Sequence, residues 1–291
     1  MELRFIIEER TTQTIGNYLR YERAFSKRLL KKVQYAGTVW QAGIKRRLND
    51  QVQLGELKII LPTELPQTHL RRSQQAIEIC YEDDWFIVVN KPAGLLSIPS
   101  WQNNQDSLIQ RVLAYFEKQN VQGSNAHIVT RLDIGTKGLV LIAKNHYAKQ
   151  QLHNQKISRR YYAVIQGHLE AEDGEIQLSI RRAEGTRREC HPTGKEACTR
   201  YWLKARGEGC DLVELELETG RTHQIRVHMA AIGHPLLGDY LYGDADVAEH
   251  PYLQSYALAF MHPVTQQQVT VMLPICKKFL TTCQVENNPV Y

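Results

Sequence analysis

The sequence has no apolar run that could cross a membrane. A spanning helix needs about 20 consecutive apolar residues, and the 291 residues contain no such segment. The first residues, MELRFIIEER, also lack the apolar core of about 7–15 residues that a signal peptide needs. We therefore expect a cytoplasmic protein without a membrane partner.

Paired cysteine motifs are missing as well. None of the six cysteines belongs to a C-x-x-C pair, which argues against a zinc ribbon or a thioredoxin-like site. A chain of this length can bury about 75% of its unfolded surface and needs no disulfide framework. We interpret these cysteines as reduced and mostly buried; they are Cys80, Cys190, Cys198, Cys210, Cys276 and Cys283.

Several patterns of cofactor and hydrolase sites are absent. Neither G-x-G-x-x-G nor G-x-x-x-x-G-K-[ST] occurs, which argues against nucleotide loops, and G-x-S-x-G of serine hydrolases is also missing. His223 and His228 are five residues apart, so the two rings diverge by about 140° on a helix and point to opposite sides of a strand. We expect neither a metal nor a cofactor.

The net charge of +5 is unevenly distributed. Residues 1–72 hold 14 Lys and Arg against 7 Asp and Glu, so this part is positively charged. The rest of the chain holds the other 22 of 36 Lys and Arg against 24 of 31 Asp and Glu, so it is slightly negative. The bases cluster in SKRLLKK (26–32) and KRR (45–47). A solvated helix face could explain them, but a phosphate-backbone partner explains them better. The candidate RNA-contacting residues here are Lys31, Lys32, Arg46 and Arg47.

Two domains are predicted. The segment LPTELPQTHLRRSQQ (61–75) has prolines and no periodicity, so we place a linker at 66–78 between domains at 1–65 and 79–291. Residues 26–36 have helical spacing that Gly37 would end. In the second domain we expect apolar strands at 85–89, 139–143 and 212–218, helices at 107–118 and 146–157, and a C-terminal hairpin. The strands and helices do not alternate regularly. This order predicts an α+β fold.

The stretch RLDIGTKG (131–138) places one carboxylate, Asp133, before a tight turn. No second acid lies within ten residues of it. Another stretch, GRTHQIRVHMAAIGHPLLGDYLYG (220–243), is rich in glycine and cations. We expect Thr222 to cap a helix there, which places Arg221 and Arg226 near its positive end. An anion should lie opposite, either a protein carboxylate or an RNA phosphate.

Five motifs follow one another over about residues 81–275. They are YEDDWFIVVNKPAGLLSIP, RLDIGTKGLVLIAKN, RRYYAVIQG, GKEACT and GRTHQIRVHMAAIGHPLLGD. In this order they resemble the motifs of the RluA/RluD-type RNA pseudouridine synthases, with two departures, Thr130 for histidine and Lys137 for serine. The N-terminal segment, through Ser26–Lys32, Gly37 and Gly55-Glu56, resembles the S-four-like RNA-binding domain.

The resemblance implies roles for individual residues. Asp133 would be the catalytic aspartate, paired with Arg226. Arg131 would enter the RNA stack where the target base leaves, and Tyr161 would pack on the flipped uracil and could take its C5 proton. Pseudouridylation is an isomerisation that consumes no water, so a second carboxylate and a metal are dispensable. Further RNA-binding residues are expected at Lys137, Lys195, Arg221 and His223.

The resemblance also implies a small N-terminal α/β RNA-binding domain and a catalytic domain with a largely antiparallel mixed sheet. We expect a monomer that modifies ribosomal rather than transfer RNA. One rival hypothesis is an inactive RNA-binding or ribosome-assembly protein that keeps the fold. Another is a glycosylase that releases uracil, which would need a positioned water and usually a second acid.

Overall fold

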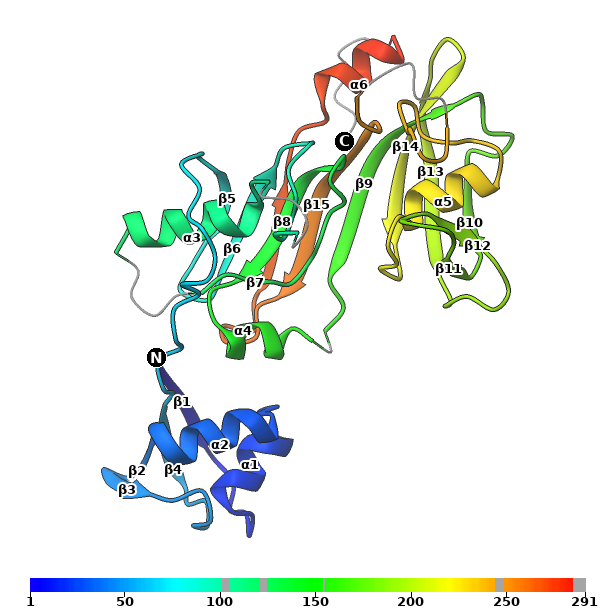
Figure 1. Cartoon of the computed structure of the whole chain (residues 1–291). Coiled ribbons are helices and arrows are strands. Elements are labelled where there is room, and N and C mark those ends of the chain that lie inside the picture. Colours follow the sequence, from blue (N-terminus) through cyan, green and yellow to red (C-terminus); the bar gives the residue numbers. More distant parts are fainter. Residues whose placement is uncertain (101–104, 121–124, 154, 244–248, 285–291) are drawn as a thin grey trace.

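The computed structural model describes residues 1–100, 105–120, 125–153, 155–243 and 249–284. The N-terminal sixty residues form a small sheet with two helices on it, and the rest of the chain forms a long, twisted sheet (Figure 1). The small sheet is antiparallel, in the order β1-β4-β2-β3. Its elements are β1 (Glu2–Ile7), α1 (Ile15–Tyr21), α2 (Lys27–Ala36), β2 (Thr38–Gln41), β3 (Ile44–Arg46) and β4 (Gly55–Ile60).

The basic helix α2 forms as the sequence predicts. The Ser26 hydroxyl accepts a hydrogen bond from the Leu29 amide at 3.1 Å and caps the helix start. Leu29 and Val33 are buried against the sheet. The helix ends at Gly37, where an added Cβ would lie 2.7 Å from the Ile60 carbonyl oxygen, so only glycine lets the chain pass this close to β4.

The large sheet runs in the order β10-β13-β14-β9-β15-β8-β6-β5, with β16 on β15 and β7 on β8. The pair β15 and β8 is parallel and the other pairs are antiparallel, which confirms the predicted α+β fold. Its strands are β5 (Glu78–Glu82), β6 (Phe86–Lys91), β7 (His127–Ile128), β8 (Lys137–Ala143), β9 (Ser158–Gln166), β10 (Asp173–Gln177), β13 (Cys198–Arg206), β14 (Cys210–Leu217), β15 (Leu253–Met261) and β16 (Gln268–Met272). The separate hairpin is β11 (Ile180–Arg182) with β12 (Arg188–Cys190).

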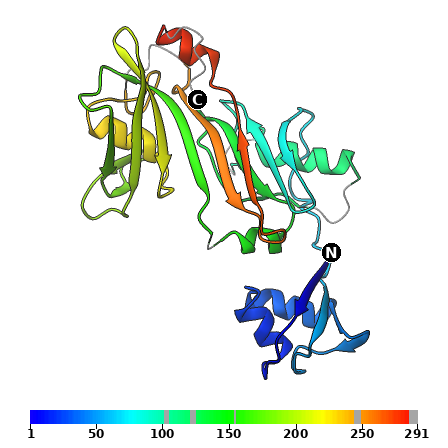
Figure 2. The same cartoon turned by 180° about the vertical axis from the view of Figure 1, so that it is seen from behind.

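Helices cover both faces of this sheet (Figures 1 and 2). On one face, α3 (Leu108–Lys118) packs near β6 and α5 (Gln224–Ala231) near β13, and both contribute to one apolar core. On the other face lie α4 (His146–Gln151) and α6 (Lys277–Thr282). Because α3 and α5 stand apart, the centre of the sheet between them stays accessible, and β9 lies there.

Several local predictions need correction. The helix predicted at 146–157 ends at Gln151, and Asn154 lies outside the described residues. Thr222 is not the cap of α5, because His223 takes that position with a left-handed φ of 58°. The predicted C-terminal hairpin is confirmed as β15 and β16. None of the six cysteines forms a disulfide, but only Cys210 and Cys283 are fully buried.

The segment that joins the two sheets, residues 61–77, has no helix or strand. It is nevertheless attached to the large domain, because the Glu64 carboxylate contacts the His127 ring at 2.7 Å and accepts the His146 amide at 2.5 Å. Within the described part of the chain, no helix is both long enough and apolar enough to span a bilayer.

Candidate active site

The loop between β7 and β8 carries Asp133 and is held in place by buried hydroxyls. Thr130 Oγ1 accepts the Leu141 amide at 2.9 Å, and Ser97 Oγ donates to the Leu132 carbonyl at 2.6 Å. At the end of the loop, a Cβ on Gly138 would lie 2.1 Å from the Ser255 carbonyl oxygen. Glycine is therefore required for β8 to begin its parallel pairing with β15, which accounts for the tight turn after Asp133.

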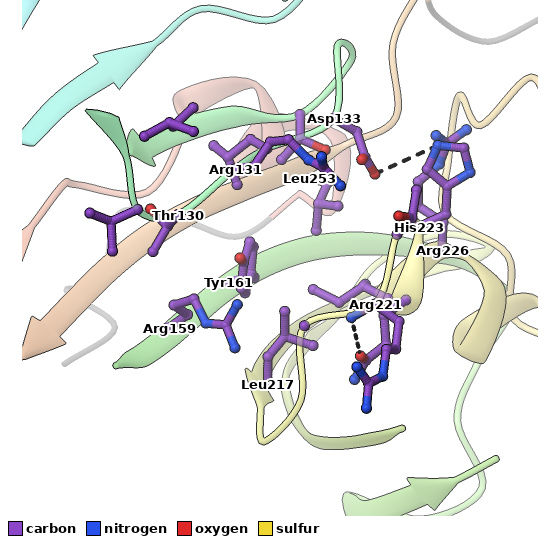
Figure 3. Close-up of a pocket in the computed structure, with 18 of the residues that line it drawn as sticks. Thr130, Arg131, Asp133, Arg159, Tyr161, Leu217, Arg221, His223, Arg226 and Leu253 are labelled. Carbon is purple, nitrogen blue, oxygen red and sulfur yellow. Dashed lines mark hydrogen bonds and ion pairs between the residues drawn. The ribbon is translucent and has the colours of Figure 1, made fainter. Parts of the chain in front are cut away.

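Asp133 opens into a pocket of about 320 Å³ that its own loop, β9 and the start of α5 line (Figure 3). The side chain of Asp133 is 24% exposed. It is the one carboxylate among the described residues that line the pocket. Four arginines also line it: Arg131 from the same loop, Arg159 from β9, Arg221 from just before α5 and Arg226 from within α5.

Arg226 makes no hydrogen bond or ion pair with Asp133 among the described contacts, although the two charges are close enough to interact. Its Nε and Nη2 donate to the two carboxylate oxygens of Asp239, at 2.7 and 2.5 Å. Asp239 is fully buried, so its negative charge needs a cationic partner, and the bidentate contact with Arg226 supplies one. The anion opposite the start of α5 is thus a protein carboxylate. Arg221 instead directs its Nε to the Glu196 carbonyl oxygen at 3.0 Å.

Among the described contacts, His223 is the side chain within ion-pair distance of the Asp133 carboxylate, with its Nε2 3.9 Å from Asp133 Oδ2 (Figure 3). This distance is beyond hydrogen bonding, and the His223 Nδ1 lies 2.9 Å from the Tyr242 hydroxyl. Burial lowers the pKa of His223, and the nearby Arg226 and Arg188 lower it further, whereas Asp133 opposes the shift. At neutral pH the ring is therefore uncharged and leaves Asp133 without a cationic partner on that side.

Tyr161 and Arg159 project from β9 into the same pocket (Figure 3). Residues two apart on a strand share a face, so both point toward α5. Tyr161 is 5% exposed, and burial raises the pKa of its hydroxyl. Arg159 was not predicted from the sequence, although its spacing from Tyr161 was a usable signal.

Lys91 is a second residue that the sequence interpretation missed. It is fully buried, and its Nζ donates to the carbonyl oxygens of Pro92, Leu95 and Ile134 at 3.0, 2.7 and 3.2 Å. Burial lowers its pKa to about 7, and the charge of Asp133 opposes that shift. Lys91 thereby joins the end of β6 to the Asp133 loop. The signal for it was a lysine closing the buried run FIVVN.

Other predicted residues lie away from the pocket. Lys137, expected among the RNA-binding residues, places its Nζ 5.0 Å from the centre of the Phe279 ring and does not line the pocket. Lys195 is exposed near β11. The N-terminal bases lie in the other domain, with Lys31 and Lys32 on α2 and Arg46 and Arg47 at and just after β3.

His223 and His228, whose spacing argued against a shared metal, are each held by protein atoms. His228 is buried between the Thr199 hydroxyl at 3.0 Å and the Leu178 carbonyl oxygen at 2.9 Å. Across the described residues, no group of three or more His, Cys, Asp or Glu side chains is arranged to hold a metal ion.

Comparison with known proteins gives the class that this fold and site define. The model of the RNA pseudouridylate synthase family matches residues 85–231. The solved structure of human RNA Pseudouridylate Synthase Domain Containing 4 shares the fold, with a TM-score of 0.57 at 20% identity over 72% of this chain and 94% of that one. Human RNA Pseudouridylate Synthase Domain Containing 1 gives a TM-score of 0.56 at 20% identity, and the match covers 76% of this chain and 99% of that one.

Relatives found by sequence share a higher identity with this chain than these two structures do. The uncharacterized RNA pseudouridine synthase YjbO of Bacillus subtilis is 33% identical over 92% of this chain and 97% of its own length. The dual-specificity RNA pseudouridine synthase RluA of Pasteurella multocida is 37% identical over 68% of this chain and 93% of its own length. The ribosomal large subunit pseudouridine synthase D of Zymomonas mobilis is 36% identical over 66% of this chain and 67% of its own length. The chain therefore belongs to the RNA pseudouridylate synthase family, as an enzyme of the RluA/RluD type.

Proposed function

We propose that this enzyme isomerises specific uridines of ribosomal RNA, with Asp133 as its reacting group. The observation that carries the proposal is a pocket that holds a single carboxylate, Asp133, among its described lining residues, together with four arginines, of which Arg226 is already bound to Asp239. Guanidinium groups suit RNA phosphates, and a single carboxylate suits a reaction that consumes no water. The name of the Zymomonas relative, a ribosomal large subunit pseudouridine synthase, favours this substrate.

The chemistry that fits the pocket is breakage of the glycosidic bond, rotation of the uracil and bonding of its C5 to the sugar carbon. Asp133 can add covalently to the sugar or the base, or it can act as a base on the ribose. The target uridine must leave its stack, at a cost of a few kcal/mol, and stacking on Tyr161 would recover part of that cost.

Tyr161 is better suited to stacking than to accepting the C5 proton. Its raised pKa keeps the phenol protonated at neutral pH, and a protonated phenol cannot take up a proton without first losing its own. This leaves the removal of the C5 proton to another acceptor. Arg131 lies on the Asp133 loop and is exposed, as insertion into the RNA stack requires.

The N-terminal domain, placed at 1–65 before a linker at 66–78, would add a second RNA contact through its exposed bases, Lys31, Lys32 and Arg47, with Arg46 beside them. We take the protein to act as a cytoplasmic monomer. The rival glycosylase would need a second acid, and among the described pocket residues no second carboxylate exists.

The Asp133→Asn variant tests the proposal. Its substrate is ribosomal RNA labelled with tritium at uridine C5, prepared from cells that lack the protein, and tritium release reports isomerisation. We expect release to be abolished while RNA binding is kept. Asp173→Asn, at an exposed carboxylate on β10, is the matched control and should keep full activity.

Undiminished release by Asp133→Asn would refute the assignment of Asp133. Free uracil among the products would favour the glycosylase, and RNA binding without any release by the wild type would favour the inactive binding protein. Mapping pseudouridines in total RNA with and without the protein would identify the RNA and the position.

A further inference from the structure

A second hollow, which we call the interdomain groove, lies between the start of α2 and the region of α4. It has a volume of about 530 Å³. Its walls come from the N-terminal domain on one side and from α4, the segment after it and the start of β9 on the other. In Figures 1 and 2 the small domain lies beneath the end of the large sheet that carries α4.

The two walls of the groove are docked on each other. Tyr147 of α4 is buried in the core of the N-terminal domain, with its ring centre 5.1 Å from that of Phe25. The side-chain amides of Gln150 and Gln151 donate to the carbonyl oxygens of Ala24 and Arg23, both at 3.0 Å. Apolar packing and two hydrogen bonds therefore join the two walls of the groove.

The interdomain groove is continuous with the Asp133 pocket. Val129, Thr130 and Arg159 line both. A polymer that occupies the pocket can thus extend past Arg159 into the groove without leaving the protein surface.

The charge of the groove suits a polyanion. Arg28, Lys149 and Arg159 contribute cations, and no acidic side chain is found among its described lining residues. Ile157, which is partly exposed, adds apolar surface beside the cations. A nucleic acid strand matches this combination, because its phosphates pair with cations while its bases contact apolar side chains.

Unpaired polar atoms point to the same occupant. Gln150 Oε1, Gln155 Oε1 and Arg159 Nε are buried without a hydrogen-bond partner, which costs free energy. Because protein atoms cover them, these side chains must turn toward the groove before a ligand can supply the partner. Two acceptors and one donor fit RNA, whose 2′-hydroxyls and base amino groups donate and whose phosphates accept.

We propose that an unpaired strand of the substrate RNA passes from the Asp133 pocket over Arg159 and along the interdomain groove, with its phosphates on Lys149 and Arg28. This inference rests on the proposed function, because it extends the path of the RNA that enters the pocket. It gives the N-terminal domain a position on the same strand as the target uridine.

The test compares two full-length double variants that each lose two positive charges. Arg28→Gln with Lys149→Gln removes groove cations, and Lys118→Gln with Lys277→Gln removes exposed lysines of α3 and α6 outside the groove. Binding of a long fluorescein-labelled oligouridylate is followed by anisotropy across a salt series. Two lost single-strand phosphate contacts should flatten the salt slope by about 1.4 and raise Kd about tenfold near physiological salt. The control pair should behave as the wild type does.

A second measurement locates the strand directly. Oligouridylate carrying 4-thiouridine is crosslinked to the wild type, and we expect crosslinked peptides from the region of α4 and β9 and from the start of α2. Equal Kd and salt slope in the two double variants, or crosslinks confined to the β11–β12 hairpin, would overturn the proposal. Tritium release by the wild type and by the control pair reports separately on the proposed function, so the two failures are distinguishable.

Discussion

Replacing Arg226 by glutamine tests which carboxylate its guanidinium serves. The side chains of Arg226 and Asp239 are 2% and 0% exposed, and two short hydrogen bonds join them. Glutamine cannot supply the charge, so Asp239 would remain as a buried anion without compensation. Asp133, in contrast, is partly exposed and shares no hydrogen bond with Arg226 among the described contacts.

The magnitude follows from this burial. Removing one partner of a buried ion pair costs about 3–5 kcal/mol of unfolding free energy, which changes the unfolding equilibrium by about 10²-fold to about 4 × 10³-fold. An exposed pair contributes only about 0–1 kcal/mol. If Arg226 served Asp133 instead, its loss would therefore barely change stability and would act mainly on turnover.

The assay is a double-mutant cycle measured by urea unfolding and circular dichroism. We expect Arg226→Gln and Asp239→Asn to couple by about 2–3 kcal/mol, because each removes the same buried contact. The control cycle of Arg226→Gln with Asp133→Asn should couple by less than about 0.5 kcal/mol. Strong coupling in the control cycle with weak coupling to Asp239 would refute our account of the pocket.

Two further predictions concern stacking and pH. Tyr161→Phe should keep most of the tritium release, because the ring that stacks on the base remains. Tyr161→Leu should lower kcat/KM by about 5- to 150-fold, since stacking contributes about 1–3 kcal/mol per base. Equal losses in both variants would instead assign a role to the hydroxyl. For Glu64, burial alone would raise the pKa, but hydrogen bonds with the His127 ring and the His146 amide lower it to about 2. A lowered carboxyl pKa stabilises the fold above the ordinary value near 4.5, and this contribution is lost as pH falls toward about 2. Glu64→Gln should therefore cost up to about 3 kcal/mol in urea unfolding at pH 7, with the difference from wild type shrinking below pH 4; a constant difference across that range would contradict this origin.

Much of the organisation could be predicted from the sequence because the determinants are local. Helix α2 follows from the cap at Ser26, apolar residues at helical spacing and the close approach that only Gly37 allows. The Asp133 loop follows likewise from a contiguous motif in which Gly138 permits the pairing of β8 with β15. The α+β fold follows from the irregular order of strands and helices.

The partners in the site were decided by the tertiary structure. Sequence spacing places Arg226 at the start of a helix but does not say which carboxylate is desolvated beside it, and that carboxylate is Asp239. Lys91 reaches the Ile134 carbonyl oxygen across 43 residues, and Tyr147 enters the core of a different domain. A sequence pattern determined which face of an element is buried and where a turn must be tight. The packing of elements that are distant in the chain determined which charges meet, because the cost of burying a charge depends on the group that lies opposite it in space.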